Sequence, residues 1–84
     1  MVFEADAHVP PVVVYDANLL YTFHSRNLFL QLGVHKYVAP RWTDEIHAEW
    51  IDSLVSDGKV TRERLLHTRD IMKRVLPNAD VRNY

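Results

Sequence analysis

Two acidic side chains from distant parts of the sequence could together begin a divalent-metal site. Asp16 directly follows the hydrophobic run Val12–Tyr15, and Glu49 lies in an amphipathic segment that starts near Asp44. Magnesium and manganese prefer oxygen ligands and usually keep several waters. Clustered carboxylates with such an ion activate water for phosphodiester hydrolysis, so this is the chemistry that the two acids would support.

The place of Asp16 follows from the residues before it. Val12–Tyr15 is a β-branched run without a polar interruption, typical of a strand buried on both faces of a parallel sheet. In open α/β sheets, ligands bind beyond the carboxyl ends of the strands, where Asp16 would lie. Asp16 can also cap the next helix, and the two roles are compatible.

Glu49 belongs to a group of three acids, with Glu45 and Asp52, on one side of a predicted helix. It lies about 60° from Ile46, at the border of the apolar stripe, so packing can hold it while its carboxylate reaches a cleft. Glu45 lies further from the stripe and is the alternative acid. The competing interpretation is an ordinary exposed acidic face.

The elements that position these acids are predicted to have a β-α-β order. Residues 1–11 are interpreted as a tail and residues 12–84 as one domain. The segment 19–32 has a helical pattern that breaks near Ser25, a predicted N-cap, and ends at Gly33.

Tyr37–Ala39, closed by Pro40, is the second predicted strand, and a right-handed crossover would pair it in parallel with the first. Thr43 and Thr61 are predicted to cap two further helices, the second ending before Pro77. That second helix is expected to be buried through four residues: Leu65, Met72, Val75 and Leu76.

The helix after Thr43 carries a stripe of Ile46, Trp50 and Leu54, which His47 and Ile51 widen. No histidine pair has metal-ligand spacing, so His47 is interpreted as a core residue with its hydrogen bonds satisfied.

The charge is unevenly distributed along the 84 residues. Residues 1–58 have 3 basic and 8 acidic side chains, whereas residues 59–84 have 7 basic and 3 acidic ones. In the last helix, Arg62, Arg69 and Lys73 project along one flank and could follow an RNA phosphate backbone. An ordinary solvated helix face is the alternative interpretation.

Composition excludes several classes. The chain has no cysteine for disulfides or thiolate metal sites, and its two glycines cannot build a glycine-rich phosphate loop. No apolar run approaches the roughly 18 residues of a membrane span. The first nine residues contain Glu4 and Asp6 and no basic residue, unlike a secretory signal, so a cytoplasmic location is expected.

The segment Val12–Leu20 resembles the opening of PIN domains, in which a hydrophobic strand is followed by an aspartate, a small residue and often an asparagine. Asp16 and Asn18 match these positions.

The segment Pro40–Trp50 resembles the second motif of the same family, in which a serine or threonine opens a helix and a functional glutamate follows six residues later. Thr43 and Glu49 match it.

The resemblance implies an α/β, incomplete PIN-like (Rossmann-like) three-layer fold with a short parallel sheet flanked by helices. The implied activity is metal-dependent endoribonuclease cleavage of RNA with Mg²⁺ or Mn²⁺, often as the toxin of a toxin–antitoxin pair. Asp16 and Glu49 would be metal-binding and catalytic residues, supported by Asn18, Thr43 and Glu45. RNA and an antitoxin-like protein would be the partners.

One departure from the family lies at the end of the chain. PIN domains place further aspartates on a later strand and helix, and Val81–Tyr84 ends the sequence before such a segment. We therefore expect a truncated form that is inactive alone and self-associates into a homo-oligomer. The alternative is a non-catalytic PIN-like interaction module. A haloacid-dehalogenase-type phosphotransferase is disfavoured, because Asn18 stands where that family needs a second aspartate.

Overall fold

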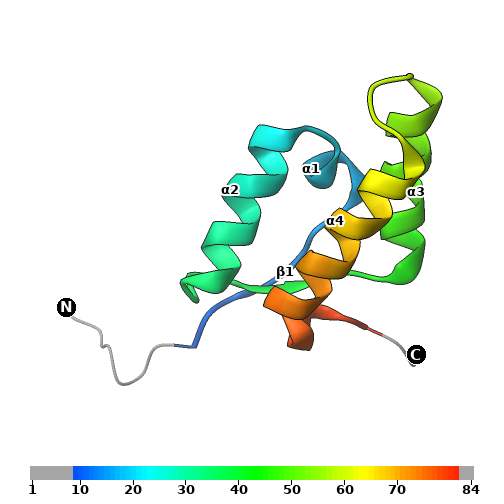
Figure 1. Ribbon diagram of the computed structural model, residues 1–84. Coiled ribbons are helices and arrows are strands. Elements are labelled where there is room, and N and C mark those ends of the chain that lie inside the picture. Colours follow the sequence, from blue (N-terminus) through cyan, green and yellow to red (C-terminus); the bar gives the residue numbers. More distant parts are fainter. Residues whose placement is uncertain (1–8, 82–84) are drawn as a thin grey trace.

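The computed structural model describes residues 9–81, which form a mixed α/β arrangement (Figure 1). The α/β class is as predicted. The elements in chain order are β1 (Val12–Val14), α1 (Ala17–Tyr21), α2 (Phe23–Val34), β2 (Ala39–Arg41), α3 (Asp44–Ser56), α4 (Arg62–Val75) and the 3-10 turn η2 (Pro77–Ala79). None of the helices in this part of the chain is long and apolar enough to cross a membrane.

The two strands are parallel neighbours, as the sequence predicted, with Val13 opposite Pro40. Two backbone hydrogen bonds bracket the ladder. The Ala39 N–H donates to the Pro11 carbonyl at 2.8 Å, and the Tyr15 N–H donates to the Arg41 carbonyl at 2.9 Å. The second strand begins two residues later than predicted, because α2 and the turn after it use more of the chain.

Pro40 lies inside β2 rather than ending it. Ala39 and Arg41 make the hydrogen bonds to β1, so the missing N–H of Pro40 faces the opposite edge and leaves the ladder intact. On that opposite edge the Trp42 N–H donates to the Ala79 carbonyl, and the Trp42 carbonyl accepts from Val81, both at 2.9 Å. Residues 79–81 therefore begin a third parallel position of the sheet.

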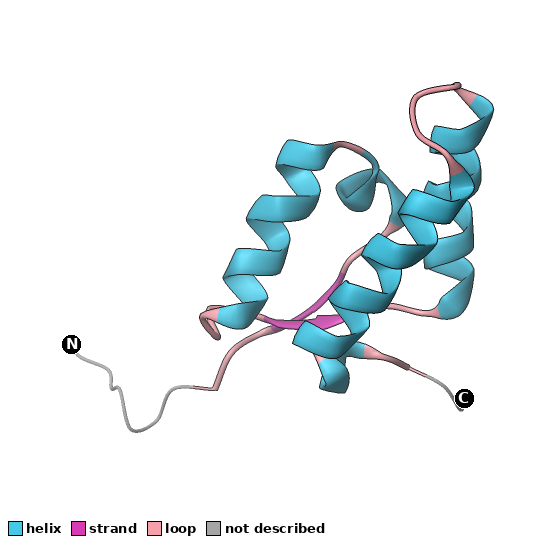
Figure 2. Cartoon of the chain, in the orientation of Figure 1, coloured by secondary structure: helices cyan, strands magenta, loops and turns pink. Residues whose placement is uncertain are grey.

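The two faces of β1 differ. Val13 packs against the core, whereas Val12 and Val14 are each 63% exposed. The prediction of a strand buried on both faces is therefore wrong for these two valines. The reason is that the helices of residues 9–81 cover one face of the sheet (Figure 2).

The break between α1 and α2 falls at Thr22, not at Ser25 as predicted. The Thr22 hydroxyl accepts the Ser25 N–H at 3.2 Å, which puts Ser25 in the first turn of α2. Arg26 holds the junction: its guanidinium donates to the Leu20 carbonyl at 2.9 Å and lies 4.9 Å from the ring centroid of Trp50. This cation–π contact ties the junction to α3.

The helix α2 ends in a Schellman motif with Lys36 in the left-handed region (φ 65°). The Lys36 N–H donates to the Gly33 carbonyl at 3.1 Å, and the Tyr37 N–H donates to the Leu32 carbonyl at 3.0 Å. Glycine usually occupies such a position, so lysine is held there at a conformational cost.

Gly33, predicted to end this helix, is instead a buried residue within it. A Cβ atom at Gly33 would lie 2.9 Å from Pro40 Cγ and 3.1 Å from Leu76 Cδ1. The glycine is therefore required by tertiary packing, because it lets α2 approach β2 and the end of α4.

The core consists mainly of α3 and the residues packed on it. The predicted α3 stripe is confirmed: His47, Trp50, Ile51 and Leu54 are buried and Ile46 is half-buried. Both predicted caps are confirmed as well, since the hydroxyls of Thr43 and Thr61 accept N–H groups of Ile46 and Arg64. Leu65 and Met72 of α4 are buried as predicted, and Leu76 packs against the core. The predicted burial of Val75 is wrong: it is 49% exposed, because it lines an open hollow beside α2 and β2.

We expect Gly33→Ala to lower the free energy of unfolding by about 1 kcal/mol. Overpacking costs about 1–3 kcal/mol, which outweighs the roughly 1 kcal/mol that alanine gains in helix propensity. Urea denaturation measures the difference. Asn27→Ala, at an exposed position of the same helix, is the matched control and should be neutral or stabilising. Equal stabilisation by both variants would contradict the packing role.

Candidate metal and catalytic site

Asp16 lies at the carboxyl end of β1 because Tyr15 fixes the strand's exit. Tyr15 is fully buried, and its hydroxyl donates to the Phe29 carbonyl at 2.7 Å. Asp16 is exposed, and its Oδ1 accepts the Leu19 N–H at 3.1 Å, so it caps α1 as anticipated. A carboxylate has lone pairs beyond those used in one cap, so this role leaves capacity for a metal.

Thr43 occupies the equivalent position on the neighbouring strand. Val14 is opposite Arg41 in a parallel register. Asp16 comes two residues after Val14 and Thr43 comes two residues after Arg41, so both lie at the same edge of the sheet. The Thr43 hydroxyl accepts the Ile46 N–H at 3.1 Å and starts α3 there. The two sequence motifs are thus brought together at one edge.

The helices α1 and α3, which begin at this edge, pack against each other. Between them is a shallow polar hollow lined by Asn18, Tyr21, Asp52, Ser53, Ser56 and Asp57. The Tyr21 hydroxyl donates to Asp57, which joins the C-terminal ends of the two helices. The predicted supporting residue Asn18 therefore faces α3.

Glu49 lies on the side of α3 that faces α1. At about 100° per residue, its direction falls between those of Asp52 and Ser53, which both line the hollow with Asn18. Glu49 lies about one helical turn before Asp52 and Ser53 in α3, and Glu45 lies one turn before Glu49. Both glutamates are exposed. The approach of the Glu49 carboxylate to Asp16 stays a prediction, as does the choice of Glu49 over Glu45.

Asp16 and Glu49 would supply only part of a ligand set for a hard cation. Within residues 9–81 no group of three or more His, Asp or Glu side chains is placed to hold a metal ion. Magnesium requires near-octahedral oxygen coordination, so water or further acids would have to complete a site built on this pair.

The predicted basic stripe of α4 is paired with carboxylates. Arg62 lies 2.7 Å from Asp52, and Arg69 lies 2.9 Å from Asp70. The third cation, Lys73, lies within ion-pair distance of Asp44 and Asp80. Exposed pairs of this kind are weak, so a phosphate backbone would compete with carboxylates for these cations.

Lys73 connects α3 and the C-terminal segment. Its Nζ lies 3.1 Å from Asp44 Oδ1 and 3.6 Å from Asp80 Oδ2. Asp80 Oδ1 also accepts the indole N–H of the buried Trp42 at 2.8 Å. The motifs in the sequence do not include Asp80. No local signal identifies it, because Trp42 lies 38 residues away.

His47 is buried, as predicted, but only one of its ring nitrogens has a partner. Nδ1 accepts the indole N–H of Trp50 at 3.0 Å, so the neutral ring carries its proton on Nε2. Nε2 is buried and has no hydrogen-bond partner among residues 9–81, which corrects the prediction of a fully satisfied histidine. The rings of Trp42 and His47 pack edge to face, with their centroids 4.9 Å apart.

Comparison of the chain with family models, curated proteins and solved structures found no match.

The surroundings of His47 predict a pH-dependent stability. The pKa of His47 is lowered to about 4, mainly by burial and also by the cations of Lys73 and Arg69, while the carboxylates of Asp80 and Asp44 oppose the shift. Between the unfolded pKa of about 6.5 and the folded value, the unfolded chain binds a proton that the folded chain does not. Stability is therefore fully present above this window and is lost as the pH falls through it.

We expect His47 to remove about 2 kcal/mol of stability between pH 7 and pH 5. Urea denaturation at these two values measures the loss. His47→Gln should flatten the dependence, whereas His67→Gln, at an exposed position of α4, should not. The same slope in the wild type and His47→Gln would show that another group is responsible.

Proposed function

We propose that this chain is the N-terminal part of a PIN-like three-layer fold and that the whole protein is a metal-dependent endoribonuclease of the toxin type. One observation supports the proposal most: Asp16 and Thr43, the central residues of the two motifs, follow adjacent parallel strands at one edge of the sheet. The packing of α1 against α3 also supports the proposal, because it places Asn18 beside the side of α3 that carries Glu49.

In this proposal, Asp16 and Glu49 bind Mg²⁺ or Mn²⁺ through their carboxylate oxygens. Asn18 and Thr43 orient the acids, as outer hydrogen bonds commonly do for ligands. The bound ion would lower the pKa of a water molecule and neutralise charge on the phosphate. Arg62, Arg69 and Lys73 are the proposed RNA contacts, at the expense of their present ion pairs.

Two carboxylates leave a doubly charged ion under-neutralised, and magnesium gives up its waters reluctantly. The proposed activity therefore depends on further acids from a longer protein. We expect the 84-residue chain to bind metal weakly and to cut RNA poorly or not at all.

The test is cleavage of mixed RNA with manganese by the 84-residue chain and by a C-terminally extended protein. In the extended protein, Asp16→Asn and Glu49→Gln should each lower the rate by at least about 100-fold, as expected for loss of a metal ligand. Glu63→Gln, at an exposed acid of α4, is the matched control. A larger loss for Glu45→Gln than for Glu49→Gln would reverse the choice of acid.

Two outcomes would contradict this proposal. One is robust cleavage by the 84-residue chain that Asp16→Asn abolishes, which would show that two acids suffice. The other is an extended protein whose activity is unchanged by both Asp16→Asn and Glu49→Gln.

The second candidate is a non-catalytic interaction module that forms homo-oligomers or binds an antitoxin-like protein. It is favoured by the outer edge of β1, where the sheet of residues 9–81 ends and Val12 and Val14 are exposed. Open β edges with apolar side chains pair readily with other strands.

Under this second candidate, the chain should self-associate with rising concentration in sedimentation velocity. Val14→Lys should reduce the association, since a lysine on an edge strand blocks pairing. Val75→Lys, at another exposed valine, is the control. A chain that stays monomeric at high concentration would contradict the homo-oligomer and leave the antitoxin-like protein as the partner.

A further inference from the structure

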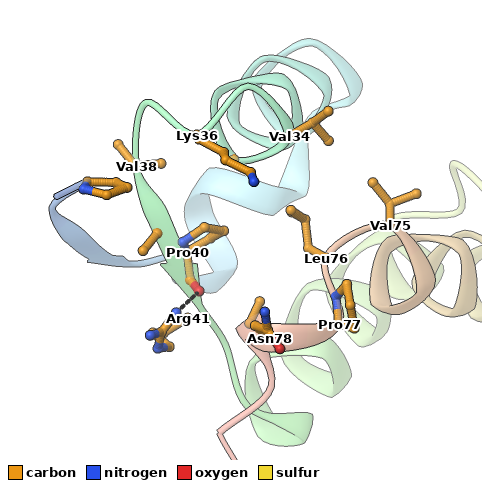
Figure 3. A pocket seen from close by; sticks show the side chains of 13 residues that line it. Val34, Lys36, Val38, Pro40, Arg41, Val75, Leu76, Pro77 and Asn78 are labelled. Atoms are coloured by element: carbon orange, nitrogen blue, oxygen red, sulfur yellow. Dashed lines mark hydrogen bonds between the residues drawn. The ribbon is translucent and has the colours of Figure 1, made fainter. Parts of the chain in front are cut away.

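A hollow of about 310 Å³ lies between the end of α2, β2 and the end of α4 (Figure 3). It is at the amino-terminal edge of β2, whereas Asp16 and Thr43 lie at the carboxyl edge. It is therefore separate from the candidate metal site. Its volume is at the lower end of the range of about 300–1,000 Å³ for small-molecule sites.

The walls of the hollow are mainly apolar. Val34 from α2, Val38 before β2 and Leu76 after α4 contribute aliphatic side chains. Pro40 lies between them with a ring that cannot adjust its shape, and Gly33 allows Pro40 and Leu76 to come close to α2. The apolar surface is thus held by the packing of three elements.

Lys36 supplies a positive charge beside this surface. In Figure 3 its side chain extends between Val38 and Val34, with the amine toward the space between Pro40 and Leu76. Among the ion pairs of residues 9–81, Lys36 has none.

The backbone of Lys36 adds an independent observation. Its left-handed conformation costs about 1 kcal/mol relative to glycine. A side chain kept at such a position at a cost in stability indicates a use for that side chain. An unpaired ammonium beside an apolar hollow has chemical complementarity to an anion with an apolar body.

We propose that this hollow binds a small apolar monocarboxylate. The alkyl or aryl body lies against Val34, Val38 and Leu76, and the carboxylate pairs with the Lys36 ammonium. Asn78, which also lines the hollow, adds a side-chain amide that can donate hydrogen bonds. The proposal does not depend on the proposed nuclease function, because the two sites lie at opposite edges of the sheet.

Both parts of the ligand contribute to the predicted specificity. An exposed ion pair increases the binding affinity only a few-fold, so most of the binding free energy comes from burial of the hydrocarbon. Octanoate should therefore bind more tightly than octanol, which has no charge, and more tightly than acetate, which has no apolar body. Octylamine should bind least among the eight-carbon compounds, because its ammonium is repelled by Lys36.

The experiment is a titration of the ¹⁵N-labelled full chain with octanoate, followed by amide chemical shifts. Saturable shifts should concentrate at Lys36, Val38, Leu76 and Asn78. Lys36→Gln should weaken binding about fivefold, whereas Lys36→Arg should retain it. Lys59→Gln, at an exposed lysine far along the chain, is the matched control.

Lys36→Gly separates the charge from the fold. It should raise the midpoint of thermal unfolding, because glycine accepts the left-handed conformation, and still weaken octanoate binding as Lys36→Gln does. The proposal is overturned if octanoate gives no saturable shifts, if the shifts lie mainly outside the hollow, or if Lys36→Gln and Lys59→Gln bind alike. Octanol binding as tightly as octanoate would equally overturn it.

Discussion

The parallel pairing of β1 with β2 is the constraint on which the remaining structure depends. Each strand has only three residues, so two flanking hydrogen bonds, at Pro11 and Tyr15, define much of the register. A slip of β1 by one residue would turn Val13 away from the helices and bring a neighbouring valine to the core side. The same register places Asp16, which follows β1, and Thr43, which follows β2, at one edge of the sheet. Short strands are sufficient here because buried aromatic residues follow each of them directly.

The pairing also gives the two edges of the sheet different chemistry. At the carboxyl edge the helices begin, and their N-terminal regions carry exposed acids and capping groups such as Asp16 and Thr43. At the amino edge the helices end, and there the structure has an apolar hollow beside Lys36.

Local patterns allowed much of the fold to be predicted from the sequence. Thr43 and Thr61 were identified as caps because a cap depends on residues within one turn, and the α3 stripe because its periodicity is regular. Gly33 was misread because its role comes from contacts with residues far along the chain. For the candidate site, the order of the motifs predicted the shared edge. The Asp80 contacts could not be predicted, since they depend on how α4 returns to the sheet.

The core around Trp42 is complete only when residues 79–81 are in place. The N–H, the carbonyl and the indole N–H of Trp42 all pair with residues 79–81. While the protein is being synthesised, these groups have no partners until that segment leaves the ribosome. Each buried polar group left unpaired costs about 1–3 kcal/mol. A nascent chain that has emerged only as far as α4 is therefore expected to remain loosely packed around Trp42 and to close its core only once residues 79–81 have emerged.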